Sequence, residues 1–295
     1  MERIAYILSN QVKLKYLAYA MVVMKVGLLS ILIFRIVGNF NASHEAFHLD
    51  PNFYYYIGVG FFAQLIDGAL GMAYGATCTS LLMSVGVPPA FATASVHTAE
   101  VFTTGASGLS HLYLGNIDKK LFFRIVIMGV VGAMLGAYLI SDVFDGGVIK
   151  PYISAYLLIL GAIIISKAFR KKKGEVVNKN LGLLGLFGGF MDAVGGGGWG
   201  PLVTSNLIRK GNSPKETIGT VNTAEFFVAF FSTGVFMLFI EITAWQPILG
   251  LIIGGIVAAP LGAFLVRFAK PKTIMVTVGV LVILLSCINL YKVLF

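Results

Sequence analysis

The chain has 295 residues, of which 57% are hydrophobic and only 12% are charged. An average soluble domain is about 45–50% apolar and about 25% charged. So little charge could not cover so much apolar surface in water. The composition therefore excludes an ordinary soluble enzyme and a disordered chain, and it predicts an all-α polytopic membrane protein. The net charge of +9 does not indicate nucleic acid, because the basic residues cluster between apolar segments, as in membrane proteins.

Seven apolar segments are long enough to cross about 30 Å of hydrocarbon as helices. In chain order they are 16–38, 91–113, 120–140, 151–169, 216–239, 246–268 and 273–294. Two more segments, 53–85 and 181–208, are also apolar but are interrupted by small residues. Because each glycine costs about 1 kcal/mol in a helix interior, the run Gly195–Gly198 should break its helix. We expect both segments to be broken-helix hairpins.

The basic residues predict the orientation. Most of the 22 lysines and arginines lie in the N-terminal tail and in the stretches 114–124, 167–179, 209–215 and 267–272. The positive-inside rule then places these stretches and the N-terminus in the cytoplasm and the C-terminus outside. The assignment requires each broken hairpin to enter and leave on one side. Lys25 and Arg35 are exceptions, because they lie within the first span.

An internal repeat relates the two halves at a constant offset of 125 residues. Asp67 matches Asp192, Gly75 matches Gly200, and the segment 96–100 matches 221–225. The predicted organisation is a tail, first helix and outer loop (1–50), repeat 1 (51–170), a basic cytoplasmic linker (171–180) and repeat 2 (181–295). The charge pattern gives the repeats opposite orientations. Inverted repeats with glycine-interrupted segments at matching positions are typical of secondary transporters, although the glycines could instead only permit close helix packing.

The segments Gln64–Gly75 and Phe187–Pro201, with the paired Thr-Ala-Glu elements at 98–100 and 223–225, resemble the TauE/SafE family of sulfite and organosulfonate exporters. The resemblance covers roughly residues 52–294. It implies a multi-pass permease of the bacterial inner membrane that moves a small sulfur-containing anion. Sulfite or a sulfonate is the expected substrate, with thiosulfate, sulfoacetate or taurine as alternatives. No enzymatic activity, cofactor or metal is expected.

A small anion could bind at the mid-membrane helix N-termini that the two breaks create, near Gly75 and Gly200, because free N–H groups and the helix dipole favour negative charge there. The candidate substrate-binding residues are Gly75, Thr77, His97, Thr98, Gly197, Gly198, Trp199, Gly200, Asn222 and Thr223. Each threonine could instead bond its own helix, and Trp199 could be a packing aromatic. His97 could be an anion ligand, a proton carrier or a satisfied polar group.

Four carboxylates, each matched between the repeats, lie at membrane depth: Asp67, Glu100, Asp192 and Glu225. Intramembrane acids cost about 2.5–3.5 kcal/mol each on insertion scales, so a functional role is the default hypothesis. Two interpretations stay open. The acids could couple proton binding to anion binding, or they could be structural, with Glu100 and Glu225 capping unwound backbone.

Three further hypotheses carry less weight. His44-Glu45-Ala46-Phe47-His48 matches a zinc-protease pattern but lies in a short outer loop without an evident third ligand. An anion channel would share the predicted architecture. The small-residue positions Gly129, Gly132 and Gly136 fit a homodimer and internal packing equally well. Membrane lipid is the expected surrounding partner.

Overall fold

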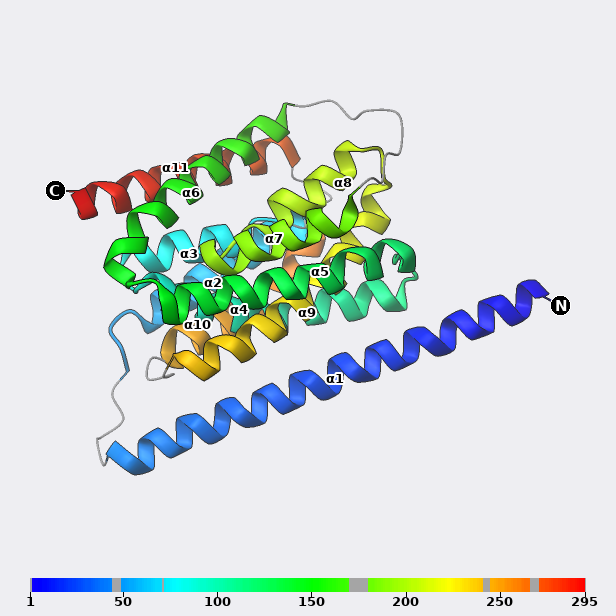
Figure 1. Ribbon diagram of the computed structural model, residues 1–295, viewed down its shortest axis with the longest axis horizontal. Helices are drawn as coiled ribbons and strands as arrows, with labels where there is room; N and C mark the ends of the chain where they lie inside the picture. Colours follow the sequence, from blue (N-terminus) through cyan, green and yellow to red (C-terminus); the bar gives the residue numbers. More distant parts are fainter. Residues whose placement is uncertain are drawn as a thin grey trace.

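The computed structural model describes residues 2–43, 49–70, 72–169, 180–240, 245–265 and 271–294. These residues form helices and connecting turns, and none of them lies in a strand. The N-terminus and the C-terminus lie at opposite ends of the molecule (Figure 1). The candidate zinc motif at residues 44–48 falls outside the described residues.

The elements follow one another as α-helices, with two short π-helical segments designated η1 and η2. Their bounds are α1 (Glu2–Ser43), α2 (Phe53–Leu70), α3 (Tyr74–Ser84), α4 (Pro89–Tyr113), α5 (Lys119–Tyr138), η1 (Leu139–Val143), α6 (Gly146–Ala168), α7 (Leu181–Gly195), η2 (Trp199–Thr204), α8 (Ser205–Arg209), α9 (Pro214–Phe239), α10 (Trp245–Leu265) and α11 (Pro271–Leu294).

The predicted spans coincide with α1, α4, α5, α6, α9, α10 and α11. Among the described residues, five helical stretches are long and apolar enough to cross a membrane: 15–38, 119–143, 146–168, 214–239 and 272–294. Helix α4 falls below that hydropathy because serine, threonine, His97 and Glu100 occupy much of its length. The polytopic membrane class therefore holds, while the count of seven spans stays a prediction.

Both predicted breaks occur in the chain. Helix α2 ends at Leu70 and α3 begins at Tyr74, while α7 ends at Gly195 and η2 begins at Trp199. In the first hairpin the Tyr55 hydroxyl, near the start of α2, donates to the Leu81 carbonyl near the end of α3. The first hairpin (α2–α3) therefore enters and leaves at the same end of the molecule. The second hairpin is formed by α7, η2 and α8.

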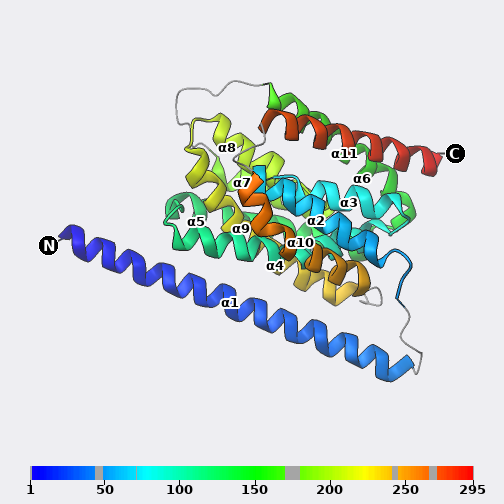
Figure 2. The same cartoon turned by 180° about the vertical axis from the view of Figure 1, so that it is seen from behind.

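The helices pair across the two halves of the chain. Helix α2 packs along α10 and α7 packs along α5, while α4 packs on α9 and α6 packs on α11 (Figures 1 and 2). Glycines allow the close approach. A Cβ on Gly254 would lie 2.6 Å from the Phe61 nitrogen, and one on Gly136 would lie 2.6 Å from the Phe190 carbonyl oxygen. The Gly129–Gly136 face of α5 is thus used for packing inside the chain.

Helix α1 runs along one side of the other helices (Figure 2). Met21, Leu28 and Leu32 are buried, while most other described apolar side chains of α1 are exposed or half-buried. Its two intramembrane cations bond backbone carbonyls of the bundle. The Lys25 ammonium donates to Phe102 O at 3.2 Å, and the Arg35 guanidinium donates to Met237 O at 3.1 Å. These contacts explain how two basic residues are accommodated within a predicted span.

Candidate functional site

The site begins where the tips of the two broken hairpins touch. A Cβ on Gly75 would lie 2.9 Å from Gly197 Cα and closer still to the Gly196 carbonyl oxygen. At the repeat-equivalent position, a Cβ on Gly200 would lie 2.8 Å from Met72 Cβ. The Thr79 hydroxyl donates to Gly196 O at 2.9 Å and ties α3 to the opposite tip. Only glycine backbone permits this contact, because any side chain at Gly75 would overlap main-chain atoms of the other hairpin.

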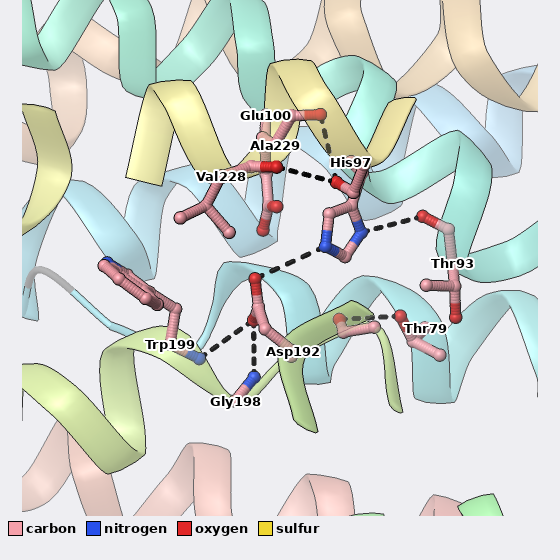
Figure 3. Close-up of polar contacts among 12 residues, drawn as sticks. Thr79, Thr93, His97, Glu100, Asp192, Gly198, Trp199, Val228 and Ala229 are labelled. Carbon is pink, nitrogen blue, oxygen red and sulfur yellow. Dashed lines mark hydrogen bonds and ion pairs between the residues drawn. The ribbon is translucent and has the colours of Figure 1, made fainter. Parts of the chain in front are cut away.

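Asp192 holds the tip of the second hairpin. Its Oδ1 accepts hydrogen bonds from the backbone N–H of Gly198 at 2.6 Å and of Trp199 at 2.9 Å (Figure 3). These are the first N–H groups after the break, which the helix cannot satisfy itself. In the first hairpin the backbone of Tyr74 bonds the carboxylate of Asp67, the equivalent pair in the repeat. The two aspartates therefore occupy the helix N-termini at which the sequence predicted a substrate anion, and they carry out the capping that the sequence analysis considered for Glu100 and Glu225.

The other oxygen of Asp192 faces His97. Asp192 Oδ2 lies 3.3 Å from His97 Nε2, and the two side chains are 2% and 0% exposed. On the far side of the ring, His97 Nδ1 lies 3.0 Å from the Thr93 carbonyl oxygen (Figure 3). The Phe236 ring meets the imidazole edge to face at 5.8 Å between centroids. The imidazole of α4 is thus aimed at the tip of the second hairpin.

The four predicted carboxylates gather around this contact. Asp67, Asp192 and Glu225 all lie within electrostatic range of Glu100. Glu100 is 2% exposed, and its Oε2 has no hydrogen-bond partner among the described residues. Ionised carboxylates in such a group would repel one another strongly at low dielectric. Protons or cations must therefore neutralise part of the cluster.

His97 and two of the carboxylates are spaced so that they could also bind a cation. The ligand atoms of His97, Glu100 and Asp192 all lie within 4.8 Å of one another, and all three residues are buried. A closed structural zinc site uses four protein ligands, and three come together here. The spacing does not by itself distinguish a metal ion from protons held between the same atoms.

Several predicted donors already have partners. The hydroxyls of Thr98 and Thr223 both bond their own helices, to Ala94 O and Gly219 O, each at 2.7 Å. The Trp199 indole N–H donates to Val221 O at 3.1 Å, and the side chain is fully buried. In this conformation none of the three is available to donate a hydrogen bond to a substrate.

Other predicted residues keep free capacity. The Thr77 hydroxyl is buried and has no hydrogen-bond partner among the described residues. Asn222 donates to Ser107 Oγ at 2.9 Å, while its Oδ1 has no such partner. Gly197 lies at the tip contact, and its carbonyl oxygen accepts a hydrogen bond from the Tyr156 hydroxyl at 3.1 Å. Tyr156 and Thr79 were not among the predicted site residues. No motif marks Tyr156, and the match of Thr79 with Thr204 in the internal repeat does not indicate what its hydroxyl would bond.

A small cavity adjoins this centre. It has a volume of about 10 Å³ and is lined by Phe91, Ala94, Ser95, Thr98, Phe236, Met237, Ile240 and Ile248, on α4, α9 and α10. That volume corresponds to roughly one water molecule, which is too little for a tetra-atomic oxyanion. A larger hollow of about 400 Å³, lined by Tyr16, Leu17, Ala20, Ile117, Lys119, Phe122 and Phe123, lies elsewhere, between α1 and α5. At the tips themselves the backbone of Gly75 is in direct contact with Gly196 and Gly197, so the hairpin contact is closed in this conformation.

The fold is that of a polytopic membrane protein with a polar centre. Its helices are long and apolar, its two broken hairpins meet tip to tip, and a group of acids lies at their contact. Comparison with known proteins identifies it further. The sequence profile of the family described as "Sulfite exporter TauE/SafE" matches residues 56–289. The "Probable membrane transporter protein YtnM" of Bacillus subtilis (strain 168) is 46% identical over 238 residues, which cover 77% of this chain and 79% of the relative. No solved structure matches the chain.

The chain belongs to the TauE/SafE family, and it is a multi-pass membrane transporter. The matched region begins within α2 and leaves α1 outside it. Both helix breaks and all four carboxylates lie inside the match.

Proposed function

We propose that the protein is a secondary transporter of a small sulfur-containing anion, with sulfite or a sulfonate as the substrate. The single observation that carries this proposal is the direct contact of two broken hairpins at a group of acids matched between the repeats. Irregular backbone at membrane depth occurs where it is buried or lines a transport path. The family's description supplies the substrate class.

Two inverted repeats, 51–170 and 181–295, alternate access to this contact. The reciprocal helix pairs α2–α10 and α7–α5 support a two-fold relation, as do the equivalent bonds from Asp67 and Asp192. The tips are in direct contact at Gly75 and Gly197, so the two repeats move relative to each other before substrate enters between them. The chain lies in the bacterial inner membrane with its N-terminus in the cytoplasm.

The substrate binds between the tips, near Gly75, Thr77, Gly197 and Gly200, once they separate. Asn222 adds a polar side chain there, because its amide oxygen has no partner among the described residues. The carboxylates must be neutralised when an anion is bound, so proton binding accompanies transport. A homodimer is compatible with this mechanism but is not required by it.

Flux of sulfite into proteoliposomes tests the proposal, with and without an imposed pH gradient. Taurine, sulfate and thiosulfate serve as competitors. We expect saturable sulfite flux that responds to the gradient. Flux of a competitor instead of sulfite would change the substrate, whereas unsaturable flux that follows voltage would indicate a channel. Absence of flux for every anion, from protein shown to be folded, would contradict the proposed function.

A further inference from the structure

The polar contacts of His97 point to a proton between the two halves of the chain. A carbonyl oxygen only accepts hydrogen bonds, so the nitrogen facing Thr93 O, which is Nδ1, must carry a hydrogen. In the neutral ring Nε2 then presents a lone pair to Asp192 Oδ2 at 3.3 Å. A lone pair facing a carboxylate oxygen is repulsive. One additional proton, on Nε2 or on the carboxyl group, turns this contact into a hydrogen bond.

That proton would join elements of different repeats. His97 lies on α4 of repeat 1, and Asp192 ends the first arm of the second hairpin in repeat 2. The same carboxylate holds Gly198 and Trp199 at the tip through its other oxygen. Loss of the proton would make His97 and Asp192 repel each other at the point where the repeats meet.

The repeat has no second pair of this kind. The residue equivalent to His97 is Asn222, whose side chain does not titrate and instead donates to Ser107. The partner equivalent to Asp192 is Asp67, which bonds the backbone of Tyr74. Because repeat 2 has an asparagine where repeat 1 has a histidine, only one such proton is bound per chain.

Most of the elements packed on α4 contribute ionisable groups around the pair. Helix α10 contributes none, since Trp245–Leu265 contains no ionisable side chain, and Asp142 of η1 is exposed. The groups that face the centre are Glu100 of α4 itself, Asp67 of α2, Tyr74 and Cys78 of α3, Tyr156 of α6, Glu225 of α9 and Lys25 of α1. Apart from Lys25, which bonds Phe102 O, these groups are neutral or acidic. A further cation, the Lys167 ammonium of α6, bonds the Pro201 carbonyl oxygen of η2. The imidazole is the group that lies against Asp192 Oδ2 and can become cationic there.

We propose that His97 and Asp192 together bind one proton, and that this proton is transported in the same direction as the anion. The proposal rests on the proposed function. With its proton the pair carries no net charge, and without it the pair is anionic and repels an incoming anion. Protonation therefore precedes anion binding, and deprotonation accompanies anion release. One proton carried with one monovalent anion moves no net charge.

Accumulation of a sulfonate in proteoliposomes tests this stoichiometry. A simple alkanesulfonate is the probe because it stays ionised throughout, whereas sulfite itself titrates near neutrality. A gradient of one pH unit, acidic outside, should drive about tenfold accumulation inside, because a tenfold concentration ratio balances one proton. Accumulation should not change when the membrane potential is clamped with potassium and valinomycin. The ratio does not depend on the transport rate.

His97→Asn copies the residue found at the equivalent position of repeat 2. It should reduce the ratio of inside to outside sulfonate concentration to about one. This ratio does not depend on how fast the variant exchanges the anion. His111→Asn is the matched control, because it makes the same substitution farther along α4 at a ring that contacts Asn116. The control should retain about tenfold accumulation. Undiminished accumulation by His97→Asn would overturn the proposal, and His97→Gln repeats the test if the asparagine variant does not fold.

Nitrogen NMR of labelled histidine measures the proton without transport. The chain has four histidines, so replacing His44, His48 and His111 by glutamine leaves His97 as the one signal. We expect Nδ1 to stay protonated while the Nε2 signal changes with pH. A pH-independent ring, or a stoichiometric metal that is lost in His97→Asn, would overturn the proposal. If no anion exchanges at all, the proposed function fails, and the NMR titration alone decides whether the proton is bound.

Discussion

Gly75 is a residue at which the two hairpins are in direct backbone contact. We expect Gly75→Ala to destabilise the fold by about 1–3 kcal/mol and to reduce transport strongly, because its Cβ would overlap the backbone of Gly196 and Gly197. Thermal unfolding in detergent and sulfite flux measure the two effects. Gly58→Ala is the matched control, since nothing lies within 4 Å of a Cβ there. In a helix interior that change should add up to about 1 kcal/mol of stability. Equal behaviour of the two variants would contradict the tip contact.

Threonines of this centre differ in the hydrogen-bond partner of their hydroxyl group. Thr98 and Thr223 bond their own helices, whereas Thr79 bonds the opposite hairpin. Nothing in the sequence around these threonines separates the two cases, since a hydroxyl bonds whichever acceptor packing brings near it. The repeat predicted Asp67 and Asp192 as a matched pair, together with Glu100 and Glu225. It could not show that they, rather than Glu100 and Glu225, cap the unwound backbone.

The hairpins are the elements that depend most on one another. Thr79→Val should destabilise their contact by about 1–3 kcal/mol, because it leaves the buried Gly196 carbonyl without its donor while preserving side-chain volume. Thr79→Ser should behave like the parent protein, since it keeps the hydroxyl. The unfolding temperature in detergent and the rate of sulfite flux report the difference. Equal unfolding temperatures of the Thr79→Val and Thr79→Ser variants would show that this hydrogen bond does not hold the tips together.

Most element boundaries followed from local signals. Apolar length predicted the long helices, and the glycine clusters predicted breaks within a few residues of Ala73 and Gly198. The η2 segment was not predicted as π-helical. Its wider turn contains Pro201, directly after Gly200, where the sequence analysis expected the N-terminus of a helix. π-Helical turns recur at functional sites, and this one directly follows the N–H groups held by Asp192.

At the scale of the whole molecule, the opposite placement of the termini should be reflected in the membrane topology. Alkaline phosphatase fused after the C-terminal Phe295 should be active, and green fluorescent protein fused there should be dark, because that end is predicted outside. The same reporters inserted in the basic linker 171–180 should give the inverse result. Matching signals from the two positions would contradict the inverted arrangement of the repeats. The fusion proteins need only be assayed in intact bacterial cells.

The sequence by itself determined the membrane class, the positions of the helices and of their breaks, the four matched acids and the family. These are local or repeated properties: hydropathy, glycine content and spacing are present in the chain before it folds. Only the tertiary structure decided which atoms meet. The contact of His97 with Asp192 joins helices far apart in sequence, and it forms because glycine tips let two hairpins pack without side chains between them. The same packing left Asn222, the equivalent residue, bonded to Ser107.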